Sequence, residues 1–163
     1  MRLEPTPPAP GAGRASGRVL FVCTGNSSRS QMAEALTDQL SGGQVEAHSA
    51  GSQPTRLHPN TVEVMRSYGL DLAGRRAKHL DEYAGQQLDY VVTLCDRVRE
   101  VCPEFGGPEL GGPARHLHWS IANPAEPARS DRASYPAYVQ VAAELAARIA
   151  LFLDLAAHDQ EAG

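Results

Sequence analysis

The chain has 163 residues, which is the usual size of one compact domain. Its 15 Lys and Arg against 19 Asp and Glu give a net charge of -4. This balance argues against a nucleic-acid binder, because such proteins depend on clustered cations. No apolar run approaches the roughly 20 residues of a membrane span, and the N-terminus has no apolar signal segment. We therefore expect a cytoplasmic protein with neither a nucleic-acid nor a membrane partner. We also expect it to be a monomer.

Proline and glycine dominate the first 16 residues, which read MRLEPTPPAPGAGRAS. Such a segment lacks regular hydrogen bonding and has little to anchor it to a core. We expect residues 1–16 to form a disordered tail and residues 17–163 to form a single domain.

The first ordered unit is predicted to be a strand, a turn and a helix. The apolar run Val19–Val22 is typical of a strand buried on both faces. A turn composition follows at Thr24–Ser28. A helix is expected from about Ser30, on the spacing of Met32, Leu36 and Leu40, and to end at Gly42-Gly43.

Strands and helices alternate along the rest of the chain. The pattern predicts strands at Val45–Ala50, Leu88–Leu94 and Arg115–Trp119, and helices at Pro59–Tyr68 and Ser134–Leu155. Such alternation favours a parallel sheet covered by helices on both faces, which is the α/β class.

The turn after the first strand is a candidate oxyanion site. Cys23 ends that strand, and Arg29 follows after five residues. The carboxyl ends of parallel strands bind ligands, and a small-residue loop that enters a helix presents backbone N–H groups to an anion. These dipoles would also stabilise a thiolate and make Cys23 a nucleophile. The candidate oxyanion-binding residues are Thr24, Gly25, Asn26, Ser27, Ser28, Arg29 and Ser30.

Individual residues of this loop suit individual tasks. Arg29 can hold two oxyanion oxygens at once. Gly25 and Asn26 suit positions of positive φ, and Ser30 can donate a hydrogen bond to the sulfur. The alternative is a buried structural cysteine beside an unrelated arginine.

Two further cysteines follow. Cys95 ends the predicted strand Leu88–Leu94, which places it at the same sheet edge as Cys23. Cys102 comes seven residues later, about 10.5 Å along a helix, whereas a disulfide needs Cα atoms within about 7 Å. The two can bond only if that segment unwinds. Alternatively, both are incidental buried thiols.

The segment VLFVCTGNSSRSQMAEAL contains the C-x5-R-S loop of the low-molecular-weight protein tyrosine phosphatase fold and resembles the opening of the arsenate reductases built on it. The resemblance continues in HSAGSQ, KHLDEY, DYVVTLCD and HLHWSIANPAE, from Arg18 to the last helix. It implies a flavodoxin-like fold with a four-stranded parallel sheet.

The resemblance is to thioredoxin-coupled members, and it implies a three-thiol relay. Cys23 would attack arsenate, Cys95 would attack Cys23 and release arsenite, and Cys102 would capture Cys95 as a disulfide for thioredoxin to reduce. Phosphate and sulfate would compete as oxyanions, and no tightly bound cofactor is needed. The alternatives are a low-molecular-weight protein tyrosine phosphatase and a non-catalytic arsenate- or phosphate-binding protein.

Two positions depart from the pattern that the resemblance implies. Asn123 precedes Pro124 where an Asp is the usual general acid, and an amide cannot deliver a proton. Loss of a general acid typically costs about 10²- to 10⁴-fold, most for phosphate esters. Glu126 and Asp131 are candidates to replace it, but nothing in the sequence places either at the site.

The second departure concerns a potassium site of some members, formed by an Asn, a Glu, a Ser and an Asp. Asn26, Glu34 and Ser49 match, but Lys78 stands at the Asp position. An ammonium there would replace the cation, so we expect no potassium requirement.

No metal site is predicted. His116 and His118 lie two apart on a predicted strand and share a face. No third ligand stands at a suitable spacing, so we expect a surface or core role for both.

Overall fold

The computed structural model describes residues 17–95, 114–125 and 129–161. The predicted tail, Cys102 and Glu126 therefore lie outside the described residues. The strands are β1 (Gly17–Cys23), β2 (Val45–Gly51), β3 (Tyr90–Thr93) and β4 (Arg115–His118). They form one parallel sheet in the order β2-β1-β3-β4. The predicted α/β class and four-stranded parallel sheet are confirmed.

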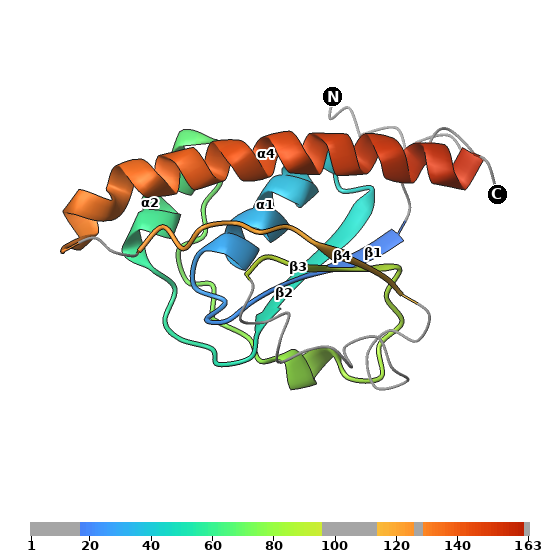
Figure 1. The fold of residues 1–163 in the computed structure, drawn as a ribbon, viewed down its shortest axis with the longest axis horizontal. Helices are drawn as coiled ribbons and strands as arrows, with labels where there is room; N and C mark the ends of the chain where they lie inside the picture. The colour runs from blue at the N-terminus through green and yellow to red at the C-terminus, as the bar shows by residue number, and fades with distance from the viewer. Residues whose placement is uncertain (1–16, 96–113, 126–128, 162–163) are drawn as a thin grey trace, which may run out of the picture.

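The helices are α1 (Arg29–Ser41), α2 (Pro59–Ser67), α4 (Asp131–Glu161) and the short 3-10 helix η1 (Leu80–Tyr83). Figure 1 shows α1 and α4 along one face of the sheet and η1 beyond the other. The α4 helix is longer at both ends than the predicted Ser134–Leu155. In the part of the chain that the structure describes, no helix is both long and apolar enough to cross a membrane.

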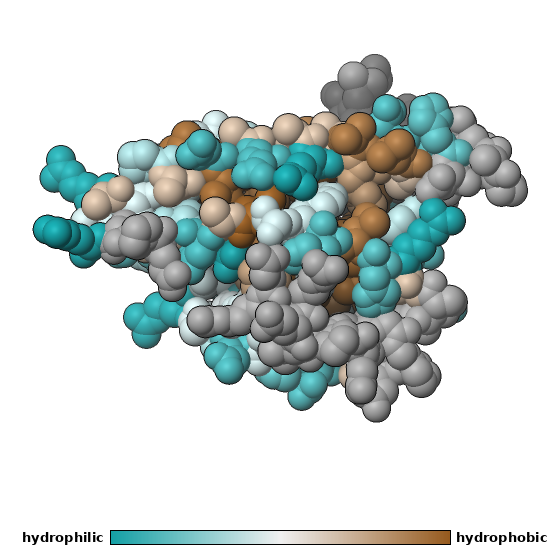
Figure 2. All heavy atoms as spheres, in the orientation of Figure 1, coloured by the Kyte–Doolittle hydropathy of each residue, from teal (hydrophilic) through white to brown (hydrophobic). Residues whose placement is uncertain are grey.

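The core lies around β1, which, like β3, has a neighbouring strand on each side. Val19–Val22 are fully buried, as a strand paired on both edges and covered on both faces requires. Helix α1 buries Met32 and Leu36 in the same core cluster. The apolar pattern fails at the end of that helix, because Leu40 is 46% exposed. Figure 2 shows apolar residues gathered over the C-terminal part of α4, where Leu151 and Leu155 are exposed.

The parallel arrangement places the ends of β1 and β3 at one edge of the sheet, where Cys23 and Cys95 lie. The end of β2 completes this edge. There Gly51 lies directly beneath the loop after β1, and a Cβ atom on it would be 2.5 Å from the Thr24 carbonyl oxygen. Since a contact that short is not tolerated with backbone, the loop can pack on β2 only because residue 51 is a glycine.

Candidate active site

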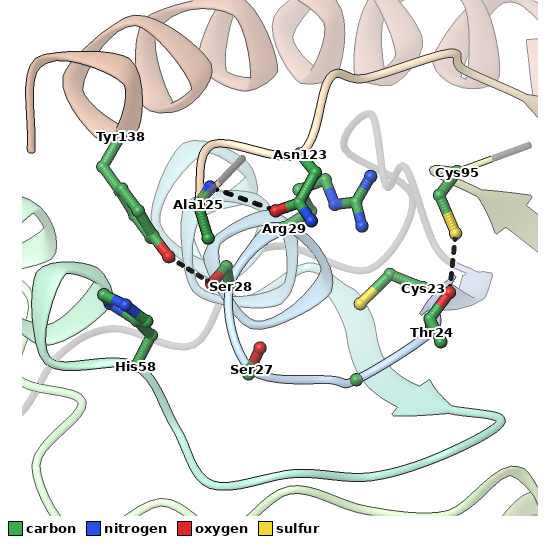
Figure 3. Close-up of a pocket in the computed structure, with 11 residues that line it drawn as sticks. Cys23, Thr24, Ser27, Ser28, Arg29, His58, Cys95, Asn123, Ala125 and Tyr138 are labelled. Atoms are coloured by element: carbon green, nitrogen blue, oxygen red, sulfur yellow. Dashed lines mark hydrogen bonds between the residues drawn. The ribbon is translucent and has the colours of Figure 1, made fainter. Parts of the chain in front are cut away.

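A pocket of about 360 Å³ opens at the carboxyl end of β1 (Figure 3). Its walls come from the loop after β1, the start of α2, the end of β3, the loop after β4, and α4. The lining residues are Cys23, Thr24, Gly25, Ser27, Ser28, Arg29, His58, Cys95, Asn123, Ala125 and Tyr138. The structure therefore brings together most of the residues proposed from the sequence, while Asn26 and Ser30 are fully buried in the wall behind them.

The loop after β1 is held by hydrogen bonds on its outer side. The carbonyl oxygens of Thr24, Gly25 and Ser27 accept hydrogen bonds of 2.9 to 3.0 Å from backbone N–H groups in the segment Gln53–His58. Because these carbonyls point away from the pocket, the loop presents its N–H edge to the pocket. That is the arrangement that binds a tetrahedral anion.

Asn26 fixes the middle of this loop. It has the expected positive φ, 48°, and is fully buried. Its Oδ1 accepts from the Lys78 backbone N–H at 2.8 Å and from Gln31 Nε2 at 2.9 Å. The expectation of a positive φ was wrong for Gly25. A Cβ at Gly25 would instead be 3.0 Å from Thr55 Oγ1 and 3.2 Å from Ser27 Oγ, so both side chains would have to shift to admit it.

The thiol of Cys23 lies in a directed hydrogen-bond network. Its Sγ is 2.8 Å from Ser30 Oγ and accepts the Asn26 backbone N–H at 3.2 Å. The Asn26 side-chain amide donates to Ser30 Oγ at 2.7 Å. This leaves the Ser30 hydroxyl hydrogen for the sulfur, so both contacts favour a thiolate.

Cys95 lies across the same pocket. It is 6% exposed, and its Sγ is 3.2 Å from Thr24 Oγ1 (Figure 3). Cys23 and Cys95 are both free thiols. Two thiols from separate strand ends therefore face one anion-binding loop.

Arg29 is the first residue of α1 and the charged group of the pocket wall. Its guanidinium donates to the Ile121 carbonyl oxygen at 2.9 Å. This bond ties the arginine to the loop after β4, so the charge is held in place before any ligand arrives.

Asn123 lines the pocket at the position proposed for the general acid. Its Oδ1 accepts the Ala125 backbone N–H at 3.1 Å, which fixes the orientation of the amide. Asp131, a candidate replacement acid, instead lies with its Oδ1 3.1 Å from His58 Nε2 and does not line the pocket. The other candidate, Glu126, lies outside the described residues.

His58 and Tyr138 also line the pocket, and the sequence analysis missed both. Their rings stack with centroids 4.8 Å apart. His58 Nδ1 accepts the Asn60 backbone N–H at 3.1 Å, and Ser28 Oγ donates to the Tyr138 hydroxyl at 3.2 Å. Burial raises the pKa of Tyr138. The spacing of Tyr138 on α4 is that of a core residue, and histidine is not a usual helix cap. Nothing in the sequence therefore indicates that Tyr138 and His58 line the pocket.

Lys78 lies where the resemblance placed a cation ligand. Its Nζ is 3.3 Å from Glu34 Oε1. The same carboxylate accepts from Ser49 Oγ at 3.2 Å and from Arg75 at 3.0 Å. Two cationic side chains therefore already neutralise Glu34.

The two strand histidines differ in their surroundings. His118 Nδ1 is 2.7 Å from Thr93 Oγ1, and His116 is exposed. Over residues 17–95, 114–125 and 129–161, no three His, Cys, Asp or Glu side chains lie where they could together hold a metal ion.

Residues 18–160 match the family model described as low molecular weight phosphotyrosine protein phosphatase. The chain belongs to this family. An arsenate reductase of Halalkalibacterium halodurans is 32% identical over 136 residues, which is 83% of this chain and 94% of the relative. These matches confirm the resemblance seen in the sequence.

Solved structures of the same family superpose well. An arsenate reductase in the phosphate binding state gives a TM-score of 0.69 at 26% identity, covering 85% of this chain and 97% of that chain. The thioredoxin-dependent arsenate reductase of Corynebacterium glutamicum gives 0.64 at 28% identity, covering 86% and 62% respectively. The phosphatase-family fold of this chain is therefore shared with arsenate reductases.

The hydrogen-bond network at Cys23 predicts how Ser30 affects thiol reactivity. Ser30→Ala removes the hydroxyl that donates to the sulfur, so the attacking sulfur loses one of the hydrogen bonds that stabilise its negative charge. We expect alkylation of Cys23 by iodoacetamide to slow about tenfold, the effect of losing one hydrogen bond to a charged group. Mass spectrometry of the peptide that contains Cys23 gives the rate.

Ser67→Ala is the matched control, since that hydroxyl donates to the Val64 carbonyl within its own helix. An equal alkylation rate in wild type and Ser30→Ala would show that Ser30 does not stabilise the thiolate.

Proposed function

We propose that this protein is an arsenate reductase that transfers electrons through Cys23, Cys95 and Cys102 in turn. The main support is the pair of free thiols that line one anion-binding pocket, Cys23 at the loop and Cys95 across from it. A phosphatase needs one nucleophilic cysteine, whereas a thiol relay needs a second within reach. The relatives named arsenate reductase add to this support.

The first step is attack of the Cys23 thiolate on arsenic. An As–S bond forms and an As–O bond breaks, so that an arsenate oxygen that already carries one proton leaves as hydroxide and takes up a second proton from solvent to become water. The N–H edge of the loop and the Arg29 guanidinium hold the remaining oxygens and their charge. The Ser30 hydroxyl, 2.8 Å from the sulfur, favours the ionised nucleophile.

The second step moves two electrons to arsenic. The Cys95 thiolate attacks Cys23 Sγ, an S–S bond forms, and the As–S bond breaks with its electron pair left on arsenic. Arsenic(V) becomes arsenic(III) and leaves as arsenite. The contact of Cys95 Sγ with Thr24 Oγ1 supports this step, because it orients the second sulfur beside the loop.

The third step regenerates the nucleophile. The Cys102 thiolate attacks Cys95, which releases Cys23 as a thiolate, and thioredoxin then reduces the Cys95–Cys102 disulfide. A thioredoxin-dependent arsenate reductase among the similar structures supports this choice of reductant. We propose a monomer of the cytoplasm, with phosphate and sulfate as competing oxyanions.

Two alternatives remain. The family name favours a protein tyrosine phosphatase, but Asn123 at the acid position would slow release of an alkoxide leaving group. The same residue favours a non-catalytic protein that binds arsenate or phosphate without turnover. Arsenate can lose an oxygen that is already protonated, so a reductase tolerates Asn123 better than a phosphatase does.

The relay predicts different numbers of turnovers in wild type and Cys102→Ser. With thioredoxin, thioredoxin reductase and NADPH, arsenate should drive continuous NADPH oxidation by the wild type. Cys102→Ser should stop after about one turnover, because the oxidised Cys23–Cys95 pair is no longer resolved. Absorbance at 340 nm follows both. Cys23→Ser, which should show no turnover, is the control.

A wild type with confirmed free thiols that fails to turn over would contradict the reductase. Tight arsenate binding in that case would favour the non-catalytic alternative.

Asn123→Asp restores an ionisable group at the pocket. If the loop after β4 presents residue 123 to the departing oxygen, the variant should raise arsenate turnover by at least about tenfold, within the usual range for a general acid. Steady-state rates measure the change. An unchanged rate would show that residue 123 does not act on the leaving oxygen. Gln140→Glu, at an exposed position of α4 outside the pocket lining, controls for the added charge.

We further propose that the ammonium of Lys78 takes the place of a bound potassium ion. Its contact with Glu34, beside Ser49 and Asn26, supports this. Arsenate reduction should therefore proceed at the same rate in potassium and sodium salts of equal ionic strength. A rate that rises steeply with potassium would contradict the proposal. Lys78→Asp, which removes the ammonium and adds a carboxylate, should create a dependence on potassium.

A further inference from the structure

We propose that Tyr138 keeps the oxyanion site open by holding the Ser28 hydroxyl away from the first turn of α1. Tyr138 is then a positioning residue that acts through Ser28. The inference rests on the anion-binding loop of the proposed function, but not on arsenate reduction.

Ser28 occupies the N-cap position of α1 and yet does not cap it. A serine at this position usually accepts a hydrogen bond from an N–H group of the first turn. Here the backbone has φ -141° and ψ -82°, and the side chain makes no capping bond. The other described helices are capped by side chains: His58 for α2, His79 for η1, and Ser130, which accepts the Ala133 N–H at 3.1 Å, for α4.

The Ser28 hydroxyl is engaged elsewhere. It donates to the phenol oxygen of Tyr138 at 3.2 Å, and the bond lies inside the protein, since Ser28 is 7% exposed and Tyr138 is fully buried (Figure 3). Burial raises the pKa of Tyr138, so the phenol stays neutral over the working pH range. The phenol oxygen accepts from Ser28 in either protonation state, so this contact does not depend on the titration of Tyr138.

The phenol itself is held rigidly. Its ring stacks on His58 with an interplanar angle of 24°. His58 in turn accepts the Asn60 N–H through Nδ1, and its Nε2 lies 3.1 Å from the Asp131 carboxylate. A ring fixed by α2 and by the start of α4 cannot follow Ser28 if the hydroxyl turns toward α1.

The consequence falls on the N–H groups of the first turn of α1. Uncapped first-turn N–H groups and the helix dipole attract an anion. If the Ser28 Oγ turned back to accept from Ser30 or Gln31, it would compete with the bound oxyanion for those donors. A serine cap stabilises a helix enough to shift such an equilibrium about fivefold. Tyr138 removes that competition.

The test is binding of inorganic phosphate to the reduced protein, measured by calorimetry. Tyr138→Phe keeps the ring but removes the oxygen that accepts from Ser28, so phosphate affinity should fall about fivefold. In the Ser28→Ala background, which has no hydroxyl to turn, Tyr138→Phe should cause no further loss. Tyr135→Phe, on the same helix but outside the pocket lining, is the matched control and should bind as the wild type does.

An unchanged affinity in Tyr138→Phe would overturn the proposal. So would an equal loss in the serine and alanine backgrounds, because the effect would then not pass through the Ser28 hydroxyl.

Amide hydrogen exchange separates this role from simple packing. Without phosphate, the Ser30 and Gln31 amides should exchange more slowly in Tyr138→Phe, since they gain a cap, whereas lost packing would make them exchange faster. Faster exchange would overturn the proposal. Ser28→Ala alone should leave these rates unchanged, and a rise would show that Ser28 already caps the helix. The exchange measurement on Ser28→Ala tests the proposal even if Tyr138→Phe does not fold.

Phosphate binding also separates this inference from the proposed function. A wild type that binds phosphate without reducing arsenate would contradict only the reductase. A wild type that binds no phosphate would contradict the anion-binding loop on which both rest.

Discussion

The hydrogen bonds between the loop after β1 and the segment Gln53–His58 are the constraint on which the site depends. A short loop of small residues has many conformations, and most would mix its carbonyls and N–H groups on both sides. The loop carbonyls are hydrogen-bonded on the outer side, to the segment that continues from β2. The side of the loop that faces the pocket is therefore left with N–H groups. Gly51 permits this pairing, because any side chain there would collide with the Thr24 carbonyl. The anion site is therefore a property of two adjacent strand ends, not of the loop alone.

Charge around the loop follows the same logic. An anion-binding loop needs positive potential, but buried cations must be compensated. Arg29 faces the pocket, while Lys78 and Arg75 are paired with Glu34 on the opposite side of the loop. The Lys78 backbone also donates to the buried Asn26 amide, so the residue that supplies the rear ion pair supports the loop through its main chain. Electrostatics and backbone support are combined in one residue.

The parts of the site that the sequence predicted are those set by strand order and local spacing. Cys23 and Cys95 share an edge because parallel strands end on the same side. The φ of Asn26 follows from local turn chemistry, but the close packing at Gly25 does not, since it involves Thr55, thirty residues away in sequence. Tyr138 could not be recognised, because its spacing on α4 is that of a core residue and its hydroxyl partner lies 110 residues earlier.

Two contacts distinguish a phosphatase from a reductase on this fold. One is the group that contacts the leaving oxygen, and the other is the group that contacts the sulfur of the nucleophilic cysteine. Asn123 can donate a hydrogen bond but no proton, and its amide oxygen is already used by the Ala125 N–H. A phosphate ester then keeps a poor leaving group, whereas the arsenic adduct is resolved by attack on sulfur, which needs a nearby thiolate and no acid. In the proposed relay that thiolate comes from Cys95, which lines the same pocket with its Sγ 3.2 Å from Thr24 Oγ1. Asn123 therefore hinders ester hydrolysis more than it hinders the proposed attack of one thiol on another.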